Sequence, residues 1–242
     1  MLYIFFMLIT KYYSPNFDLK SRSSKVITSI IIHYTGMQSA RESLIKLSSH
    51  KSKVSCHYLI NRSGKIYNLV DDKKVAWHAG KSEWGKYKNL NKNSIGIELV
   101  NKGHKYGYQS FTKAQIEILI KLCKKLKKKY KIKNNLILGH SDIAPLRKID
   151  PGEKFPWYYL SSKGISFYPE KIEKNKELKN KINLEIFFKN LHKIGYRYLN
   201  KKFNKKIIKS FQRRFRQRKV NGILDLETMK ISVILAKKPN IS

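Results

Sequence analysis

Two runs rich in β-branched and aliphatic residues carry a histidine at or near the carboxyl end. The first run is VITSIIIHY (26–34) and the second is LILGH (136–140), so these histidines are His33 and His140. Short apolar runs of this kind are typical of buried strands. In open α/β sheets, ligands bind beyond the carboxyl ends of the strands. The two runs therefore predict a sheet that brings both imidazoles to one edge.

The segments between these runs alternate between strand and helix patterns. Strands are expected at 55–61 and 65–70, joined by a hairpin turn at 62–64, and again at 94–100. Capping boxes at Ser39–Glu42 and Thr112–Gln115 begin helices that should run to about residues 48 and 131. Residues 71–93 are predicted to be a polar loop. Strands interleaved with helices indicate an α/β layer fold.

The carboxyl-terminal part of the chain has a different pattern. An irregular stretch after Pro151 is followed by three helical segments at about 183–194, 204–216 and 225–236, with Asp225 as the N-cap of the last. These segments predict a small three-helix domain. We therefore divide the chain into an N-terminal extension (1–24), an α/β domain (25–160), a linker (161–181) and a helical domain (182–242).

The net charge of +36 on 242 residues is extreme. Codon bias of an AT-rich genome explains a lysine-rich, asparagine-rich and isoleucine-rich chain without any function. The functional alternative is attraction to a polyanion such as nucleic acid, an anionic membrane or a carboxylate-rich cell wall. No nucleic-acid-binding signature accompanies the charge, so we expect no specific nucleic-acid partner. Two cysteines, Cys56 and Cys123, lie in different elements and do not form a disulfide framework.

The N-terminal segment MLYIFFMLITKYY contains an apolar stretch of nine or ten residues. This stretch is too short to span a bilayer, so we expect no transmembrane anchor. It also lacks the basic region and the small-residue cleavage site of a signal peptide. An atypical export signal, a first strand, and an upstream start with Met7 as the true initiator all stay open.

His33, His140 and Asp150 form a candidate metal site. Two imidazoles and one carboxylate hold a zinc ion and leave its fourth position for water, which is the arrangement of hydrolytic zinc sites. Glu98 ends the strand SIGIELV, and Lys148 lies two residues before Asp150. These two side chains are candidates for proton transfer and for stabilising an oxyanion. From spacing alone, hydrogen-bonded histidines, a surface carboxylate and a solvated lysine remain alternatives.

Ordered motifs along residues 14–160 carry a family resemblance. The segments are IIIHYTGM, SCHYLINRSGKIYNLV, VAWHAG, NSIGIELVN and LGHSDIAPLRKIDPGEKFPW, with YSPNF (13–17) before them. In this order the chain resembles the N-acetylmuramoyl-L-alanine amidases of the AmpD/AmiD type, the amidase_2 or peptidoglycan-recognition-like class. The resemblance implies a central mixed β-sheet flanked by helices. It also implies hydrolysis of the amide between N-acetylmuramic acid and L-alanine.

The resemblance implies a role for each candidate residue. His33, His140 and Asp150 match the zinc ligands, for one zinc ion, and Glu98 and Lys148 match the catalytic pair. Cys56 stands where related branches place a catalytic tyrosine, which favours Glu98. Leu146 departs from the usual glycine before Arg147. The residues expected to contact substrate or to lie behind the ligands are Tyr34, His57, Trp77, His78 and Arg147. His50, His104 and His192 have no motif context and are expected on the surface.

The C-terminal segments IIKSFQRRFR (207–216) and VNGILDLETM (220–229) resemble a peptidoglycan-binding helical domain. Under that interpretation Arg213, Arg214, Arg216 and Arg218 contact peptide carboxylates or are solvated. We therefore expect a monomeric zinc amidase that acts on peptidoglycan or muropeptides in cell-wall turnover or recycling. Its expected location is the cell envelope or periplasm, with the cytoplasm as the alternative. The rival function is non-catalytic peptidoglycan binding.

Overall fold

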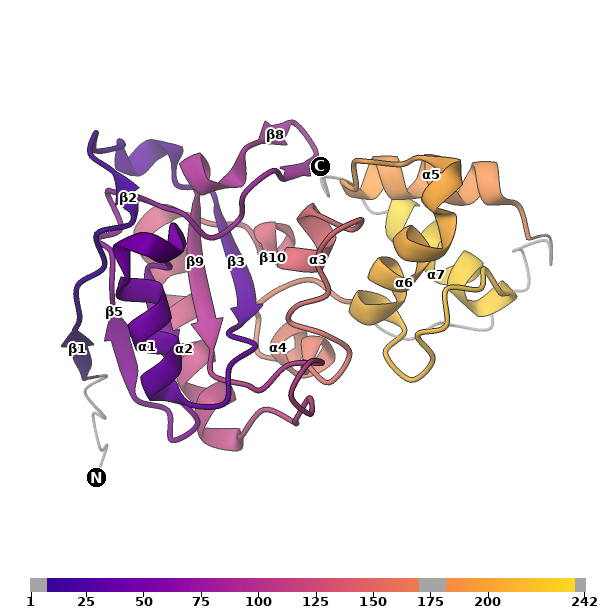
Figure 1. The fold of residues 1–242 in the computed structure, drawn as a ribbon. Helices are drawn as coiled ribbons and strands as arrows, with labels where there is room; N and C mark the ends of the chain where they lie inside the picture. The colour runs from indigo at the N-terminus through magenta and orange to yellow at the C-terminus, as the bar shows by residue number, and fades with distance from the viewer. Residues whose placement is uncertain (1–7, 170–181, 238–242) are drawn as a thin grey trace, which may run out of the picture.

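The computed structural model describes residues 8–169 and 182–237, and a mixed sheet lies at the centre of the N-terminal part (Figure 1). Its strand order is β1-β5-β4-β9-β3-β10. The bounds are β1 (Ile9–Lys11), β3 (Ser29–Tyr34), β4 (Tyr58–Ile60), β5 (Ile66–Asn68), β9 (Ser94–Leu99) and β10 (Ile137–Gly139). Only the β4–β5 pair is antiparallel among these neighbours. The predicted mixed sheet is confirmed.

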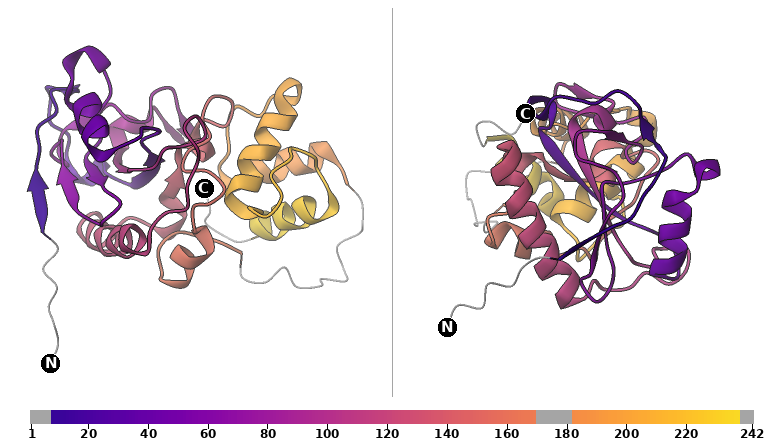
Figure 2. Two further views of the ribbon diagram at one scale, coloured as in Figure 1. Left: turned by 60° about the horizontal axis from the view of Figure 1, so that its bottom comes forward. Right: turned by 90° about the vertical axis from the view of Figure 1, so that its left-hand side faces the viewer.

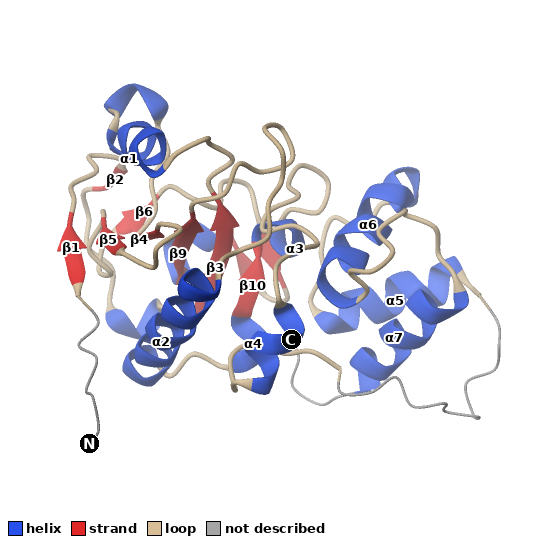
Figure 3. Ribbon diagram, turned by 90° about the horizontal axis from the view of Figure 1, so that it is seen from below, coloured by secondary structure: helices blue, strands red, loops and turns tan. Residues whose placement is uncertain are grey.

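Helices cover both faces of the sheet. Figure 3 shows α1 (Ala40–Ser48) on one side and α2 (Lys113–Tyr130) on the other. The capping box predicted at Thr112 is complete, because Thr112 and Gln115 each bond the other's backbone. The apolar stripe of α2, which includes Leu119, Cys123 and Leu126, is buried against the sheet. At α1, Ser39 caps Glu42 as expected, but the Glu42 carboxylate accepts from the Gln38 N–H instead.

Several short elements were not predicted. The expected loop 71–93 contains three two-residue strands, β6 (Val75–Ala76), β7 (Glu83–Trp84) and β8 (Tyr87–Lys88), with β6 paired to β2 (Phe17–Asp18). Strands of two residues are too short to show a period in the sequence. His140 also differs from expectation. The strand ends at Gly139, and His140 opens the short helix α3 (His140–Ile143).

The predicted N-terminal extension is not separate from the sheet. Its residues Ile9–Lys11 form β1, which pairs in parallel with β5 at the sheet edge. Residues 1–7 lie outside the described part of the chain, and so do residues 170–181 of the predicted linker. The helix α4 (Trp157–Ser162) runs two residues into that linker. Within residues 8–169 and 182–237, no helix is long and apolar enough to cross a membrane.

Three helices form the C-terminal unit, α5 (Leu184–Ile194), α6 (Asn204–Phe215) and α7 (Leu226–Lys237). Their positions match the predicted segments to within one residue at every end, and Asp225 accepts from the Thr228 N–H as expected of an N-cap. Figure 2 shows this unit beside the sheet domain, and Figure 1 shows α3 on the side of the sheet domain that faces it. Ser210 on α6 donates a hydrogen bond of 2.6 Å to the Ser141 carbonyl on α3.

Two of the four arginines in the segment 213–218 are not at the surface. Arg214 is 3% exposed and pairs with Asp142 at 3.1 Å, while its guanidinium lies 3.5 Å from the centre of the Trp157 ring. Arg216 is also buried and pairs with Asp225 and Glu227. The expectation that these side chains are solvated or contact wall peptides is therefore wrong. A charged side chain can be buried only where a partner compensates its charge. The partner of Arg214 is Asp142, 72 residues away in the sequence, so the local pattern around Arg214 does not reveal it.

Candidate metal centre

Neighbouring parallel strands bring the two candidate histidines together. Gly139 of β10 pairs with Ile32 of β3, so His140 follows its strand at the level of His33. Asp150 returns to the same point because its carbonyl accepts a 2.9 Å hydrogen bond from the Ser141 N–H. The loop between them is held at Ala144, whose carbonyl accepts from two backbone N–H groups further along. The sheet edge thus gathers all three side chains, as the strand ends predicted.

The three donor atoms form a small, nearly equilateral triangle. His33 Nδ1 lies 2.9 Å from His140 Nδ1 and 3.0 Å from Asp150 Oδ2, and His140 Nδ1 lies 3.1 Å from the same oxygen. All three residues are buried. Two ring nitrogens that face each other and a shared carboxylate oxygen cannot all be paired by hydrogen bonds among themselves. A cation placed among them satisfies all three atoms at once.

The opposite side of the His140 ring fixes which nitrogen carries its proton. His140 Nε2 lies 3.1 Å from the Ala79 carbonyl, which can only accept. Nε2 therefore carries the hydrogen, and Nδ1 presents its lone pair to the triangle. This is the usual arrangement of metal-binding histidines, whose second nitrogen donates to a carbonyl or carboxylate.

Electrostatics also favour the ligand forms of these groups. Burial, together with neighbouring His140, lowers the pKa of His33 to about 4, so its imidazole is neutral at pH 7. Burial alone would raise the pKa of Asp150, but His140 and His33 outweigh it and hold the pKa far below its ordinary value. Neutral imidazole and ionised carboxylate are the forms that bind metal. The donor set fits one zinc ion with an open fourth position.

Glu98 lies directly beside His33. The two residues are register partners on β9 and β3, so their side chains project from the same face of the sheet. Glu98 Oε2 is buried and has no hydrogen-bond partner in the described ranges. Burial, with Asp150 nearby, raises the pKa of Glu98 to about 8. A carboxyl group with a raised pKa and one buried oxygen without a partner, beside a candidate metal site, is suited to taking up and releasing a proton.

A cavity of about 330 Å³ opens over the triangle. Nine of the ten candidate site residues line it: His33, Tyr34, Trp77, His78, Glu98, His140, Arg147, Lys148 and Asp150. The cavity therefore brings together side chains from strands β3 and β9, the loop after β6, and the loop between α3 and α4. Lys148 is half-buried in this wall, within the loop that Ala144 holds.

His57 is the exception, because of the two positions expected for it, a substrate contact or a place behind the ligands, its side chain takes the second. Its side chain is fully buried and does not line the cavity. Its Nδ1 accepts from the Gly96 N–H at 3.0 Å, and its Nε2 lies 3.1 Å from the Lys74 carbonyl. The strand pattern placed His57 in a buried run but did not show which way the ring points. His57 supports β9 from behind.

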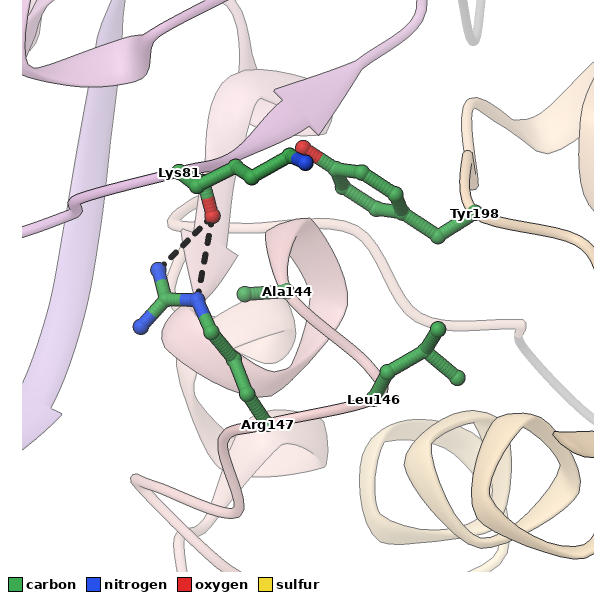
Figure 4. A pocket seen from close by; sticks show the side chains of 5 residues that line it. All are labelled: Lys81, Ala144, Leu146, Arg147 and Tyr198. Atoms are coloured by element: carbon green, nitrogen blue, oxygen red, sulfur yellow. Dashed lines mark hydrogen bonds between the residues drawn. The ribbon is translucent and has the colours of Figure 1, made fainter.

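Arg147 borders a second, smaller hollow of about 170 Å³ (Figure 4). Its guanidinium donates to the carbonyls of Ala79 and Lys81, so it fixes the backbone whose carbonyl orients His140. The other walls are Ala144, Leu146 and, from the C-terminal unit, Tyr198. Leu146, which replaces the usual glycine, is partly buried against the core. It therefore contributes a wall of this hollow without displacing Lys148 from the main cavity.

Sequence reasoning missed three residues near the site. His104, expected at the surface, is exposed but holds the Tyr34 hydroxyl at 2.9 Å through its Nδ1. Ser94 and Gly96 both touch His78. A signal for the last two exists, because Ser94, Gly96 and Glu98 alternate and therefore share one face of their strand.

The comparisons with known proteins identify the family of the chain. The family model described as N-acetylmuramoyl-L-alanine amidase (Amidase_2) matches residues 23–153, which include every candidate ligand. The chain belongs to this amidase family. It is 35% identical over 230 residues to the N-acetylmuramoyl-L-alanine amidase AmiD of Escherichia coli K12, which covers 86% of this chain and 82% of that protein.

A second relative covers less of the amidase. The 1,6-anhydro-N-acetylmuramyl-L-alanine amidase AmpD of Haemophilus influenzae is 44% identical over 115 residues, 47% of this chain and 60% of that protein. Among solved structures, E. coli AmiD in complex with anhydro-N-acetylmuramic acid-L-Ala-D-gamma-Glu-L-Lys gives a TM-score of 0.81 at 31% identity, with 93% of each chain covered. AmpDh3 of Pseudomonas aeruginosa gives 0.82 at 28% identity, covering 93% and 97%.

Proposed function

We propose that this amidase hydrolyses the amide bond between N-acetylmuramic acid and L-alanine in peptidoglycan or muropeptides, with one zinc ion held by His33, His140 and Asp150. The observation that carries the proposal is the triangle of donor atoms 2.9–3.1 Å apart at the floor of a cavity. The named relatives AmiD and AmpD support the substrate class.

Zinc bound at this site would supply Lewis-acid activation of water and of the amide carbonyl. Glu98 takes the proton of the attacking water and delivers it to the leaving amine. Its position supports this role, since it neighbours His33 and its Oε2 has no competing partner in the described ranges. Its raised pKa lets it both accept and release a proton near neutral pH.

Lys148 donates to the carbonyl oxygen as negative charge develops there. Fixed positive charge is worth most in a cavity with little water. Tyr34, Trp77 and Arg147 line the same cavity and are proposed to hold the substrate around the scissile bond. Arg147 has a second task, because it fixes the Ala79 carbonyl that orients His140.

The proposal is tested by incubating the zinc-loaded protein with muropeptides and following release of the stem peptide by mass spectrometry. We expect release that a chelator abolishes and added zinc restores. No release from the zinc-loaded protein would favour the rival function, non-catalytic peptidoglycan binding. Anhydro-muropeptides and intact sacculi, assayed side by side, distinguish a recycling enzyme from one that acts on the polymer.

Two variants separate metal binding from proton transfer. His140→Ala should lose zinc and activity together. Glu98→Gln should keep zinc and lose at least about 100-fold in turnover, since general acid–base catalysis contributes roughly 10²–10⁴-fold. Glu117→Gln on the exposed face of α2 is the matched control and should behave like the wild type. Near-normal turnover of Glu98→Gln would exclude its assigned role.

We also propose that residues 182–242 bind peptidoglycan. The helical motifs support this, although Arg214 and Arg216 are engaged inside the protein and are not available to the wall. Sedimentation of the full-length Glu98→Gln variant with insoluble sacculi tests it, and failure to co-sediment would contradict it. Cell fractionation decides between the envelope and the cytoplasm as the place where the amidase acts.

A further inference from the structure

A chain of hydrogen bonds runs from the candidate metal site into the protein behind His33. His33 Nε2 lies 3.1 Å from His78 Nδ1, and His78 Nε2 lies 3.2 Å from the Ser94 hydroxyl. The Ser94 hydroxyl in turn donates to the Leu90 carbonyl. His33, His78 and Ser94 are all buried. The proton positions along this chain can be derived one after another from its inner end.

The Leu90 carbonyl can only accept, and the Ser94 hydroxyl has a single proton to give. That proton is committed to Leu90 by the shorter of the two contacts of Ser94. Ser94 must then accept from His78 Nε2–H. A neutral imidazole with hydrogen on Nε2 has a bare Nδ1, so His78 accepts from His33 Nε2–H. His33 is left with its lone pair on Nδ1, the atom that faces His140 and Asp150.

We propose that Ser94 and His78 are positioning residues that set the tautomer and ring orientation of His33, and that this presents Nδ1 to the zinc ion. The inference rests on the zinc site of the proposed function and concerns what holds one of its ligands. His33 differs here from His140, whose proton is fixed in one step by the Ala79 carbonyl. For His33 the constraint passes through His78. Both ring nitrogens of His78 are hydrogen-bonded, one to Ser94 and one to His33, so the proton position at Ser94 determines the one at His33.

The packing of His78 against Gly96 is independent evidence that the His78 ring is held in one position. A β-carbon at Gly96 would lie 2.4 Å from His78 Cγ and 2.6 Å from its Cδ2, closer than real contacts allow. The ring of His78 therefore packs directly on the backbone of β9. The Gly96 N–H is itself held by His57 Nδ1 at 3.0 Å. Backbone and ring thus fix each other, and Ser94 two residues earlier projects from the same face of the strand.

Without this chain, the opposite tautomer of His33 is available. If Ser94 donated to His78 Nε2, then His78 Nδ1–H would point at His33 Nε2. His33 would carry its proton on Nδ1 and donate it to Asp150 Oδ2, which lies 3.0 Å away. That arrangement pairs His33 with Asp150 but removes one zinc ligand. The Ser94–Leu90 bond is what excludes it.

The test is zinc affinity of the full-length protein, measured by competition with a chromophoric chelator. Ser94→Ala should weaken zinc binding about 10–100-fold, the usual cost of removing a partner that orients a metal-binding histidine. Ser94→Thr, which keeps the hydroxyl, should recover most of the loss. Ser29→Ala is the matched control: Ser29 is the register partner of Ser94, is equally buried and donates to a backbone carbonyl, but touches no histidine. It should bind zinc like the wild type.

Tautomers are read directly from long-range ¹H–¹⁵N correlation spectra of the histidine rings in the zinc-free protein. The wild type should show His33 and His78 both protonated on Nε2. In Ser94→Ala the two rings should no longer be protonated on Nε2 alone. Protonation of His33 on Nδ1 in the wild type, or unchanged zinc affinity in Ser94→Ala, would overturn the inference. If the wild type itself bound no zinc, the proposed function would fail instead, and the spectra would still test the tautomers.

Discussion

His33 and His140 present the same ring nitrogen to the candidate metal site, yet different parts of the chain hold them. The supports of His33 are His78, Ser94 and Gly96, which all lie within residues 23–153 matched by the family model. His140 opens α3, and α3 is contacted by the C-terminal unit. One ligand is therefore supported from within the sheet domain, and the other also from outside it.

The α3 side depends on a buried charge pair. Asp142 caps the Gly139 N–H at 2.7 Å, pairs with Arg214 at 3.1 Å and accepts from the Tyr196 hydroxyl at 3.0 Å. Two of these partners belong to the C-terminal unit. This unit therefore packs on the turn that carries His140, and its connection to the catalytic domain is more than the linker that the sequence predicts. Loss of the contacts between the C-terminal unit and α3 should therefore disturb the metal site, because α3 begins at His140.

The largest effect should come from Arg214→Ala. Removing one partner of a buried ion pair leaves an uncompensated charge on Asp142, and such losses cost about 3–5 kcal/mol of folding free energy. Denaturant unfolding measures this cost. The control is Arg218→Ala, because Arg218 forms an exposed pair with Glu227 and exposed pairs contribute little. Equal stability of the two variants would mean that the C-terminal unit does not support α3.

On the sheet side, the corresponding buried carboxylate is Asp72. It accepts from the Tyr58 and Tyr130 hydroxyls at 2.7 and 2.6 Å and pairs with Lys129 at 2.9 Å. Burial raises the pKa of Asp72, but these hydrogen bonds outweigh it, and the pKa lies below its ordinary value. All of these partners lie in the sheet domain, between β4 and the end of α2.

Asp72→Asn should therefore show a stability loss that depends on pH. A carboxyl with a lowered pKa stabilises the fold above the pKa of the unfolded chain, about 3.9, and that contribution is lost as the pH falls through the folded value. The wild type should be more stable by about 2 kcal/mol at pH 7, from hydrogen bonds to a charged group. The difference should shrink below about pH 4. A difference that stayed constant down to pH 2 would contradict the assignment.

The elements with a clear period were predictable, and the contacts between distant elements were not. The strands that carry His33 and Glu98 and the helix after Thr112 were expected close to their observed positions, because burial imposes a period on their sequences. The two-residue strands after Val75 have no period to detect. Strand ends also predicted that His33 and His140 meet, which the register between β3 and β10 explains.

The direction of side chains and their contacts with distant residues could not be predicted from the sequence of the site. His57 and His78 were both expected at or behind the site, but His78 lines the cavity and His57 does not. Nothing local in the sequence distinguishes the two rings, because their directions depend on Gly96 and on Arg22. Arg214 likewise has the sequence pattern of an exposed helical arginine, and its partner Asp142 lies far away in the sequence.

Tyr196→Phe tests the C-terminal support with the smallest change. The substitution removes one hydroxyl that donates to Asp142 at 3.0 Å and keeps the buried ring, which packs against Trp84 at 4.8 Å between centroids. A hydrogen bond to a charged group is worth about 1.5–3 kcal/mol, and the Arg214 pair remains to limit the loss, so we expect about 1.5 kcal/mol.

Tyr168→Phe is the matched control, since its hydroxyl donates to the neutral Phe215 carbonyl and not to Asp142. If α3 transmits the support to His140, zinc affinity should fall for Tyr196→Phe and stay unchanged for Tyr168→Phe. Equal zinc affinity in both would confine the role of Tyr196 to stability.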